Sequence, residues 1–346
     1  MNPVKVGVIG AGYWGPNLIR NFHELPDAKM QMVCDLREDR LEHIRKLYSN
    51  VNTCTNYHEM LESDIEAVVI ATSVSSHHRI ALDCLRAGKH VLIEKPLACS
   101  TAEAVEIIAA GEEQKKVVMI GHTFVYNPAV TALKEIIASG EIGEIYYVSS
   151  TRGNLGLYQP DINVMWDLAP HDISILIYAL GIEPKYASAR GGSYVKKGVH
   201  DMANLTLYFE NGVIADLRVS WLDPCKIRCI TIVGSKKMIV YDDIEPVDKL
   251  KIYDKGVDIQ PYNDTYEEFH LAYRYGEVSS YPLKWEEPLR LECQSYIEAI
   301  RTGKPPRSNG HQGLQIVQVL EAAQKSLFNG GIQEIIPCQS TIPTLA

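Results

Sequence analysis

A strand, a glycine-rich loop and a helix follow one another at the start of the chain. The apolar run VKVGVI occupies residues 4–9, and Gly10, Gly12 and Gly15 then fit the pattern G-x-G-x-x-G ahead of a helical stretch that reaches residue 25. Such a loop lets a pyrophosphate approach the backbone at Gly12, where the amino end of the helix favours negative charge. This order of elements predicts a dinucleotide site at the edge of a parallel sheet.

Short apolar runs alternate with helical patterns over the first 120 residues. Strands are expected at 30–35, 67–72, 90–96 and 117–122, with helices at 37–48, 75–88 and 100–114 between them. Alternation of this kind is typical of a doubly wound parallel sheet with helices on both faces. We therefore expect an N-terminal Rossmann domain of the α/β class.

An acidic residue ends the second of these strands. Asp35 follows Gly15 by twenty residues, the place where a carboxylate can accept the hydroxyls of an adenosine ribose. The same carboxylate would repel a 2′-phosphate, although Arg37 could soften that repulsion. NAD is the expected cofactor, with NADP as the alternative. The alternative is a tight turn with an unrelated surface acid.

The pattern changes after residue 121. A helix is expected at 127–140, and period-two segments then cover 145–152, 186–195, 203–222 and 225–243, with turns at Asn211-Gly212 and Gly234-Ser235. Two helical stretches close the chain. We expect an α+β C-terminal domain with a large open antiparallel sheet. The expected domains are 1–122, which binds the dinucleotide, and 123–346, which binds substrate and forms oligomers.

Composition narrows the class of partner. The 346 residues carry a formal net charge of −9 without a long basic run, so nucleic acid is not an expected partner. Apolar stretches stay shorter than a membrane span, and the N-terminus lacks a signal-peptide pattern. The eight cysteines include no C-x-x-C pair, which favours reduced thiols and a cytoplasmic location.

A polar tripeptide ends the strand expected at 90–96. Glu94-Lys95-Pro96 stands where open α/β sheets bind ligands, and Pro96 biases Lys95 toward an extended backbone. The Lys95 ammonium can hydrogen-bond a substrate hydroxyl and stabilise a developing alkoxide. The alternative is a solvated strand end, which is the usual explanation for an isolated Glu-Lys pair.

A carboxylate and an imidazole stand four residues apart in the second half. If residues 165–176 open a helix, Asp167 and His171 project from one face. Three explanations compete: a metal site, an acid–base pair, and a helix start that Asp167 caps with Pro170 in its first turn. A metal needs further ligands, and no Cys or His cluster supplies them, so no metal is expected.

These motifs together resemble the glucose–fructose oxidoreductase, inositol dehydrogenase and rhizopine-catabolism (Gfo/Idh/MocA) family. The resemblance rests on GVIGAGYWG, on VVIATSVSSHHRIALDCLRAGKHVLIEKPLA, on WDLAPHDISIL and on the closing PLRLECQSYIEAIRTGKPP and GLQIVQVLEAA. It implies a Rossmann domain joined to an open antiparallel sheet, and reversible oxidation of a sugar or polyol hydroxyl. One departure is Ser73, where many members have proline.

The resemblance also assigns roles. Lys95, Asp167 and His171 match the family's catalytic trio, in which His171 would take or give the hydroxyl proton because histidine titrates near neutral pH. Asp167 would orient the imidazole or bind a neighbouring hydroxyl. The residues expected at the cofactor are Gly10, Gly12, Tyr13, Trp14, Gly15, Asp35, Arg37, Thr72, His77, Glu94 and Lys95.

The segments around 121–130, 150–176 and 233–243 resemble the branch of the family that acts on nucleotide-linked sugars. UDP-N-acetylglucosaminuronate 3-dehydrogenase is the nearest named activity. Arg152 and Asn154 could then bind a carboxylate or pyrophosphate, and Tyr126 and Asn127 could face the substrate. The alternatives are a free-polyol dehydrogenase, a redox-neutral member of the family and a non-catalytic NAD-binding regulator. The resemblance further implies a homodimer or homotetramer formed through the C-terminal sheet.

Overall fold

The computed structural model describes residues 2–156, 158, 162–259 and 271–337. It divides into two compact units. The first holds the chain up to Asn127 together with Glu286–Glu321, and the second holds Pro128–Trp285 together with residues 322–337. The expected boundary after residue 122 had placed Glu286–Glu321 in the second domain. Glu286–Glu321 belongs to the first unit because the helix at residues 288–302 packs on the first helix of the chain.

Six parallel strands form the sheet of the first unit. They lie in the order β3-β2-β1-β4-β5-β6, which is the doubly wound arrangement expected from the sequence and confirms it. Their bounds are β1 (Val4–Ile9), β2 (Ala28–Cys34), β3 (Asn52–Cys54), β4 (Ala67–Ile70), β5 (His90–Glu94) and β6 (Val118–Gly121). All residues of β4 are buried, as expected for a central strand covered on both faces.

Helices of the first unit connect and cover these strands. They are α1 (Gly15–Glu24), α2 (Glu38–Leu47), α3 (His58–Leu61), α4 (Val74–Arg86), α5 (Thr101–Glu113), the short 3₁₀ helix η1 (Thr123–Tyr126) and α8 (Pro288–Thr302). Ser100 caps α5 by accepting a hydrogen bond from the Glu103 N–H at 3.2 Å. Helix α8 packs on α1, where the rings of Phe22 and Tyr296 meet edge to face at 6.2 Å and Arg20 pairs with Glu287.

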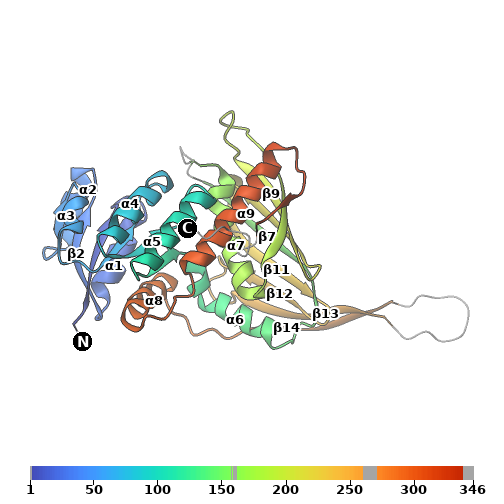
Figure 1. Ribbon diagram of the computed structural model, residues 1–346. Coiled ribbons are helices and arrows are strands. Elements are labelled where there is room, and N and C mark those ends of the chain that lie inside the picture. The colour runs from blue at the N-terminus through green and yellow to red at the C-terminus, as the bar shows by residue number, and fades with distance from the viewer. Residues whose placement is uncertain (1, 157, 159–161, 260–270, 338–346) are drawn as a thin grey trace, which may run out of the picture. The chain divides into compact units, whose positions relative to one another are not determined.

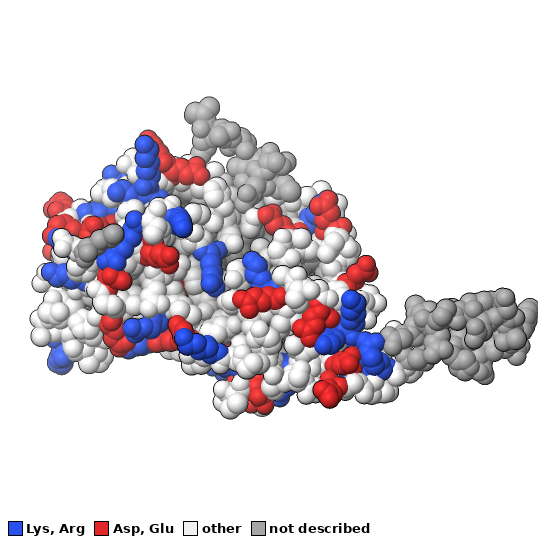
Figure 2. Space-filling model, turned by 90° about the horizontal axis from the view of Figure 1, so that it is seen from below, with Lys and Arg blue, Asp and Glu red and all other residues white. Residues whose placement is uncertain are grey.

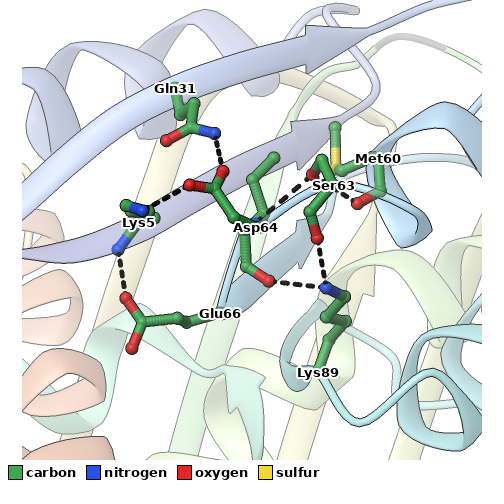
Figure 3. Close-up of polar contacts among 8 residues, drawn as sticks. Lys5, Gln31, Met60, Ser63, Asp64, Glu66 and Lys89 are labelled. Carbon is green, nitrogen blue, oxygen red and sulfur yellow. Dashed lines mark hydrogen bonds and ion pairs between the residues drawn. The ribbon is translucent and has the colours of Figure 1, made fainter.

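A polar network closes the amino-terminal edge of this sheet (Figure 3). The Lys5 ammonium on β1 pairs with Asp64, and the Lys5 N–H donates to Glu66 at 3.1 Å. The Lys89 ammonium donates to the carbonyls of Ser63 and Ile65, both at 2.8 Å. These bonds hold the turn before β4 to its neighbours at the amino-terminal ends of the strands. Ligands of open α/β sheets bind at the opposite, carboxyl-terminal ends.

Nine strands form the sheet of the second unit, in the order β14-β13-β12-β11-β7-β10-β9-β8-β15. Neighbours are antiparallel except β7 and β10, which are parallel, so the expected open antiparallel sheet is confirmed with one parallel pair added. The bounds are β7 (Ile145–Leu155), β8 (Pro184–Gly192), β9 (Met202–Phe209), β10 (Ile214–Ser220), β11 (Leu222–Gly234), β12 (Met238–Asp242), β13 (Leu250–Ile259), β14 (Leu271–Ser280) and β15 (Glu334–Ile335).

Helices lie on one face of this sheet (Figure 1). Helix α7 (Val164–Leu180) packs on β7, β9 and β10, and α6 (Pro128–Ala138) packs on α7. Helix α9 (Gly310–Phe328) starts in the first unit and ends in the second. Because side chains alternate along β10, Ala215, Leu217 and Val219 are buried, whereas Ile214 is exposed on the other face.

On the face drawn in Figure 2, acidic and basic side chains of the described residues are interspersed. None of the helices in the described part of the chain is both long and apolar enough to cross a membrane.

Candidate active site

The glycine loop after β1 has the geometry that a bound pyrophosphate requires. Gly10 has a φ of +101°, and a Cβ there would lie 2.4 Å from the Ala71 carbonyl oxygen. A Cβ on Gly15 would lie 2.0 Å from the Gly10 oxygen, so both glycines are needed for the turn. At Gly12 the nearest heavy atom would be an Arg40 nitrogen at 3.5 Å, which leaves room above the backbone. The loop therefore fits NAD.

The carboxylate of Asp35 lies beside this loop at the end of β2. It is buried and accepts hydrogen bonds from the N–H groups of Ala11 at 2.7 Å and Arg37 at 2.9 Å. These two bonds fix the carboxylate where a ribose would meet it. Arg40, which the sequence analysis passed over, adds an ion pair to Asp35 at 3.2 Å. Arg37 instead pairs with Asp39 at 2.6 Å, so the cation that softens the charge of Asp35 is Arg40.

A buried histidine joins the end of β4 to the turn after β5. The two ring nitrogens of His77 lie 3.0 Å from the Pro96 carbonyl and 3.1 Å from the Thr72 carbonyl. His77 is 1% exposed, so its two hydrogen bonds are shielded from water and hold the end of β4 to the turn after β5. The side chain of Thr72 accepts a hydrogen bond from the Ser76 hydroxyl at 2.7 Å.

Lys95 follows β5 at the carboxyl edge of the sheet, and its bond to Pro96 is cis. Beside it, burial raises the pKa of Glu94 to about 7, although the Lys95 charge and hydrogen bonds from the Lys95 N–H and Trp14 oppose the rise. Burial and the Lys95 charge lower the pKa of His122 to about 3, so the His122 ring is neutral at pH 7. Tyr13 in the glycine loop is 86% exposed and can contact a ligand.

A second buried carboxyl group, Glu292 on α8, faces Glu94 in this unit. Burial and the charge of Glu94 raise the pKa of Glu292 well above its ordinary value. A side-chain hydrogen bond from Thr123 opposes the rise for Glu292, whereas Glu94 Oε1 has no hydrogen-bond partner within the described part of the chain. The carboxyl groups of Glu94 and Glu292 are therefore most stable in their protonated, neutral forms. Sequence reasoning missed Glu292 because it lies far along the chain in an ordinary amphipathic helix.

In the second unit, Asn163 caps α7 by accepting from the N–H groups of Met165 at 3.0 Å and Trp166 at 3.2 Å. The expected cap, Asp167, instead lies inside the first turn, and the helix continues past Pro170. Asp167 and His171 are one turn apart on α7, as the spacing predicted. The Asp167 Oδ2 accepts a hydrogen bond from the Trp221 indole at 3.0 Å.

Arg152, expected at the substrate, forms a buried ion pair with Asp172. Its Nε and Nη2 donate to the two Asp172 oxygens at 2.8 and 2.9 Å, and the two side chains are 4% and 2% exposed. Burial alone would lower the pKa of Arg152, but the charge and hydrogen bonds of Asp172 reverse the effect and raise it. The structure thus places Asp172, adjacent to His171, against Arg152.

The other expected substrate residues differ in exposure. Tyr126 and Asn127 are both 2% exposed, and the Tyr126 hydroxyl lies 3.1 Å from the Ser308 hydroxyl. The Tyr126 side chain is therefore packed within the first unit. Asn154 on β7 is half-buried. In the described ranges, no group of three or more His, Cys, Asp or Glu side chains is arranged to hold a metal ion.

Comparison with known proteins agrees with this architecture. Residues 4–122 match the model described as "Oxidoreductase family, NAD-binding Rossmann fold", and residues 130–240 match the "GFO/IDH/MocA C-terminal domain". A crystal structure assigned as an oxidoreductase, from Magnetospirillum magnetotacticum, is 31% identical, covers 93% of this chain and 100% of its own, and superposes with a TM-score of 0.79.

Two curated relatives act on sugar or polyol substrates. The myo-inositol 2-dehydrogenase of Thermotoga maritima is 24% identical over 94% of this chain and 96% of its own. The UDP-N-acetylglucosamine 3-dehydrogenase of Acidithiobacillus ferrooxidans is 26% identical over 91% of this chain and 94% of its own. The two matched domain models show that the chain belongs to the Gfo/Idh/MocA family of oxidoreductases and carries its NAD-binding Rossmann domain.

Proposed function

We propose that the protein is an NAD-dependent dehydrogenase that oxidises a secondary hydroxyl of a nucleotide-linked sugar, with C3 of UDP-N-acetylglucosaminuronate as the first candidate. The observation that carries the proposal is the pair Asp167 and His171, held one turn apart on α7 in a chain whose Rossmann sheet presents Lys95 after β5. Neither a regulator nor a structural protein needs this combination of acid, base and cation.

The chemistry of a carbinol explains these three residue types. Bound NAD supplies the hydride acceptor. The hydroxyl proton must leave as well, and His171 would accept it during oxidation and return it during reduction. Lys95 would donate a hydrogen bond to the reacting oxygen and stabilise its negative charge. Asp167 would bind a neighbouring hydroxyl or orient the imidazole.

Two relatives support different substrates. The Acidithiobacillus relative is named for a UDP-linked sugar and the Thermotoga relative for myo-inositol. Arg152 was the side chain expected to bind the anionic part of a nucleotide sugar, and it is already paired with Asp172 inside the second unit. This pairing favours a free polyol as the second candidate, since a polyol needs no cation for recognition.

We also propose that a second copy covers the outer face of the nine-stranded sheet. Tyr147 and Ile214 are exposed there on the central strands β7 and β10, and Tyr186 is exposed on β8, next to the edge strand. Large apolar side chains on a broad sheet face commonly mark a subunit interface. Light scattering would test this directly, and a monomer at all concentrations would contradict it.

The substrate is tested by following NADH absorbance with purified protein, NAD and four compounds: UDP-N-acetylglucosaminuronate, UDP-N-acetylglucosamine, glucose and myo-inositol. We expect the highest kcat/KM with the UDP-uronate. A parallel series with 2-oxoglutarate detects turnover in which NADH stays bound. Higher kcat/KM with myo-inositol would replace the nucleotide sugar by the polyol. NAD binding without any turnover would contradict the catalytic proposal.

A further inference from the structure

We propose that Trp221 is a positioning residue that orients the carboxylate of Asp167 through its indole N–H. The inference rests on the proposed role of Asp167 in substrate chemistry and adds a residue that the local motif does not contain. Trp221 lies directly after β10, whereas Asp167 lies in the first turn of α7, and both belong to the second unit. The indole Nε1 and Asp167 Oδ2 are 3.0 Å apart.

The direction of this bond is fixed by chemistry. An indole N–H can donate and cannot accept, so the Asp167 oxygen must be the acceptor. Trp221 is 1% exposed, and water does not compete for the N–H in such a site. A hydrogen bond to an ionised carboxylate is stronger than one between neutral groups. The bond therefore restricts rotation of the Asp167 carboxylate and directs its remaining oxygen.

Trp221 is held by two backbone hydrogen bonds and one ring contact. Its backbone N–H donates to the Asp201 carbonyl at 2.9 Å, and its backbone carbonyl accepts from the Gly156 N–H at 3.0 Å. The ring of Tyr158 packs on the indole with a centroid distance of 5.0 Å. A Cβ on Gly156 would lie 2.7 Å from Trp221 Cδ1, so the absence of a side chain there lets the indole take this position.

The Asp201 side chain strengthens this anchor. Its Oδ2 accepts from the N–H groups of Tyr194 at 2.8 Å and Val195 at 2.9 Å, and the residue is fully buried. The carbonyl that holds Trp221 thus belongs to a residue fixed by its own hydrogen bonds. Trp221 is consequently a rigid donor, which is what orientation of a flexible carboxylate requires.

The hydrogen bond is tested first, without any reference to activity. The chain has four tryptophans, at 14, 166, 221 and 285, whose indole N–H proton resonances can be assigned by single replacement with phenylalanine. We expect Asp167→Asn to shift the indole N–H signal of Trp221. The signal of Trp166, whose indole donates to Gln324 at 2.7 Å, should stay unchanged. An unmoved Trp221 signal would refute the hydrogen bond.

The role is tested by kinetics with a substrate that the wild type oxidises. Trp221→Phe should lower kcat about tenfold or more, since one charge-assisted hydrogen bond is lost, while NAD affinity stays unchanged. Trp166→Phe is the matched control, because it removes an indole hydrogen bond of a buried residue on α7 itself. It should lower the melting temperature as much as Trp221→Phe does and leave kcat intact.

A second variant acts on the indole from the other side. Gly156→Ala should displace the Trp221 ring without changing any hydrogen-bonding side chain. We expect it to lower kcat, as Trp221→Phe does. Equal kcat for Trp221→Phe and Trp166→Phe would overturn the positioning role. If the wild type turns over none of the four substrates, the proposed function fails, whereas the resonance experiment still decides whether Trp221 holds Asp167.

Discussion

The ion pair between Arg152 and Asp172 provides the sharpest stability prediction. Asp172→Asn keeps the volume of the side chain and removes its charge, so no cavity is created. Arg152 would then remain buried, with one neutral oxygen in place of the two carboxylate oxygens at 2.8 and 2.9 Å. Two hydrogen bonds between charged groups are weakened and a buried cation loses its counter-ion. We expect a loss of about 3–5 kcal/mol in the free energy of unfolding.

Urea denaturation followed by circular dichroism measures this loss, because urea does not screen charges. Glu210→Gln is the matched control, because it removes the ion pair between Glu210 and Lys185. The Lys185 side chain is 46% exposed and that of Glu210 is 75% exposed. That surface pair should contribute less than about 1 kcal/mol. Replacing both members of the buried pair, Arg152→Met with Asp172→Leu, should recover most of the stability lost in Asp172→Asn.

A cost for Asp172→Asn no larger than that for Glu210→Gln would refute the reasoning. It would mean that the pair is hydrated in solution or that Arg152 turns away from Asp172. Arg152 would then again be a candidate for the anionic part of a substrate.

Three further predictions concern the first unit. Because folding raises the pKa of Glu94 to about 7 and that of Glu292 well above its ordinary value, their stabilising contribution is complete below about pH 4.5 and is lost as the pH rises above it, by up to about 1.4 kcal/mol per pH unit and group. Glu292→Gln should flatten the fall in melting temperature between pH 5 and 8, and an unchanged slope would contradict the buried pair. Asp35→Ala should weaken NAD binding about tenfold or more and reduce discrimination against NADP, as measured by cofactor fluorescence titration, and an unchanged NAD affinity would exclude Asp35 from the ribose site. Gly10→Ala should lower the free energy of unfolding by about 1–3 kcal/mol, because φ is +101° and the new Cβ would meet the Ala71 carbonyl; a wild-type urea midpoint would contradict this.

Local sequence patterns were sufficient for the fold. The glycine loop, the alternation of strands with helices and the period-two segments after residue 121 each depend on neighbours in the chain, and the structure confirms both sheets. The parallel pairing of β7 with β10 was not predictable, because residues between them belong to a helix and two further strands.

The side-chain partners required the structure. Arg37 and Arg40 follow Asp35 by two and five residues, and the nearer Arg37 pairs with Asp39 whereas Arg40 reaches Asp35. Arg152 has the chemistry of an anion-binding residue, yet Asp172, twenty residues later, takes its hydrogen bonds. Glu292 and Trp221 have no local motif, since each acquires its partner through packing of distant segments.

The central claim is that Lys95 and His171 perform the chemistry while the glycine loop and Asp35 bind NAD. The most direct test measures NADH formed in a single turnover by the wild type, Lys95→Ala and His171→Ala, with NAD affinity determined on the same samples. The account predicts unchanged NAD affinity and a rate at least about 10²-fold lower in both variants. A wild-type rate in either variant would contradict it.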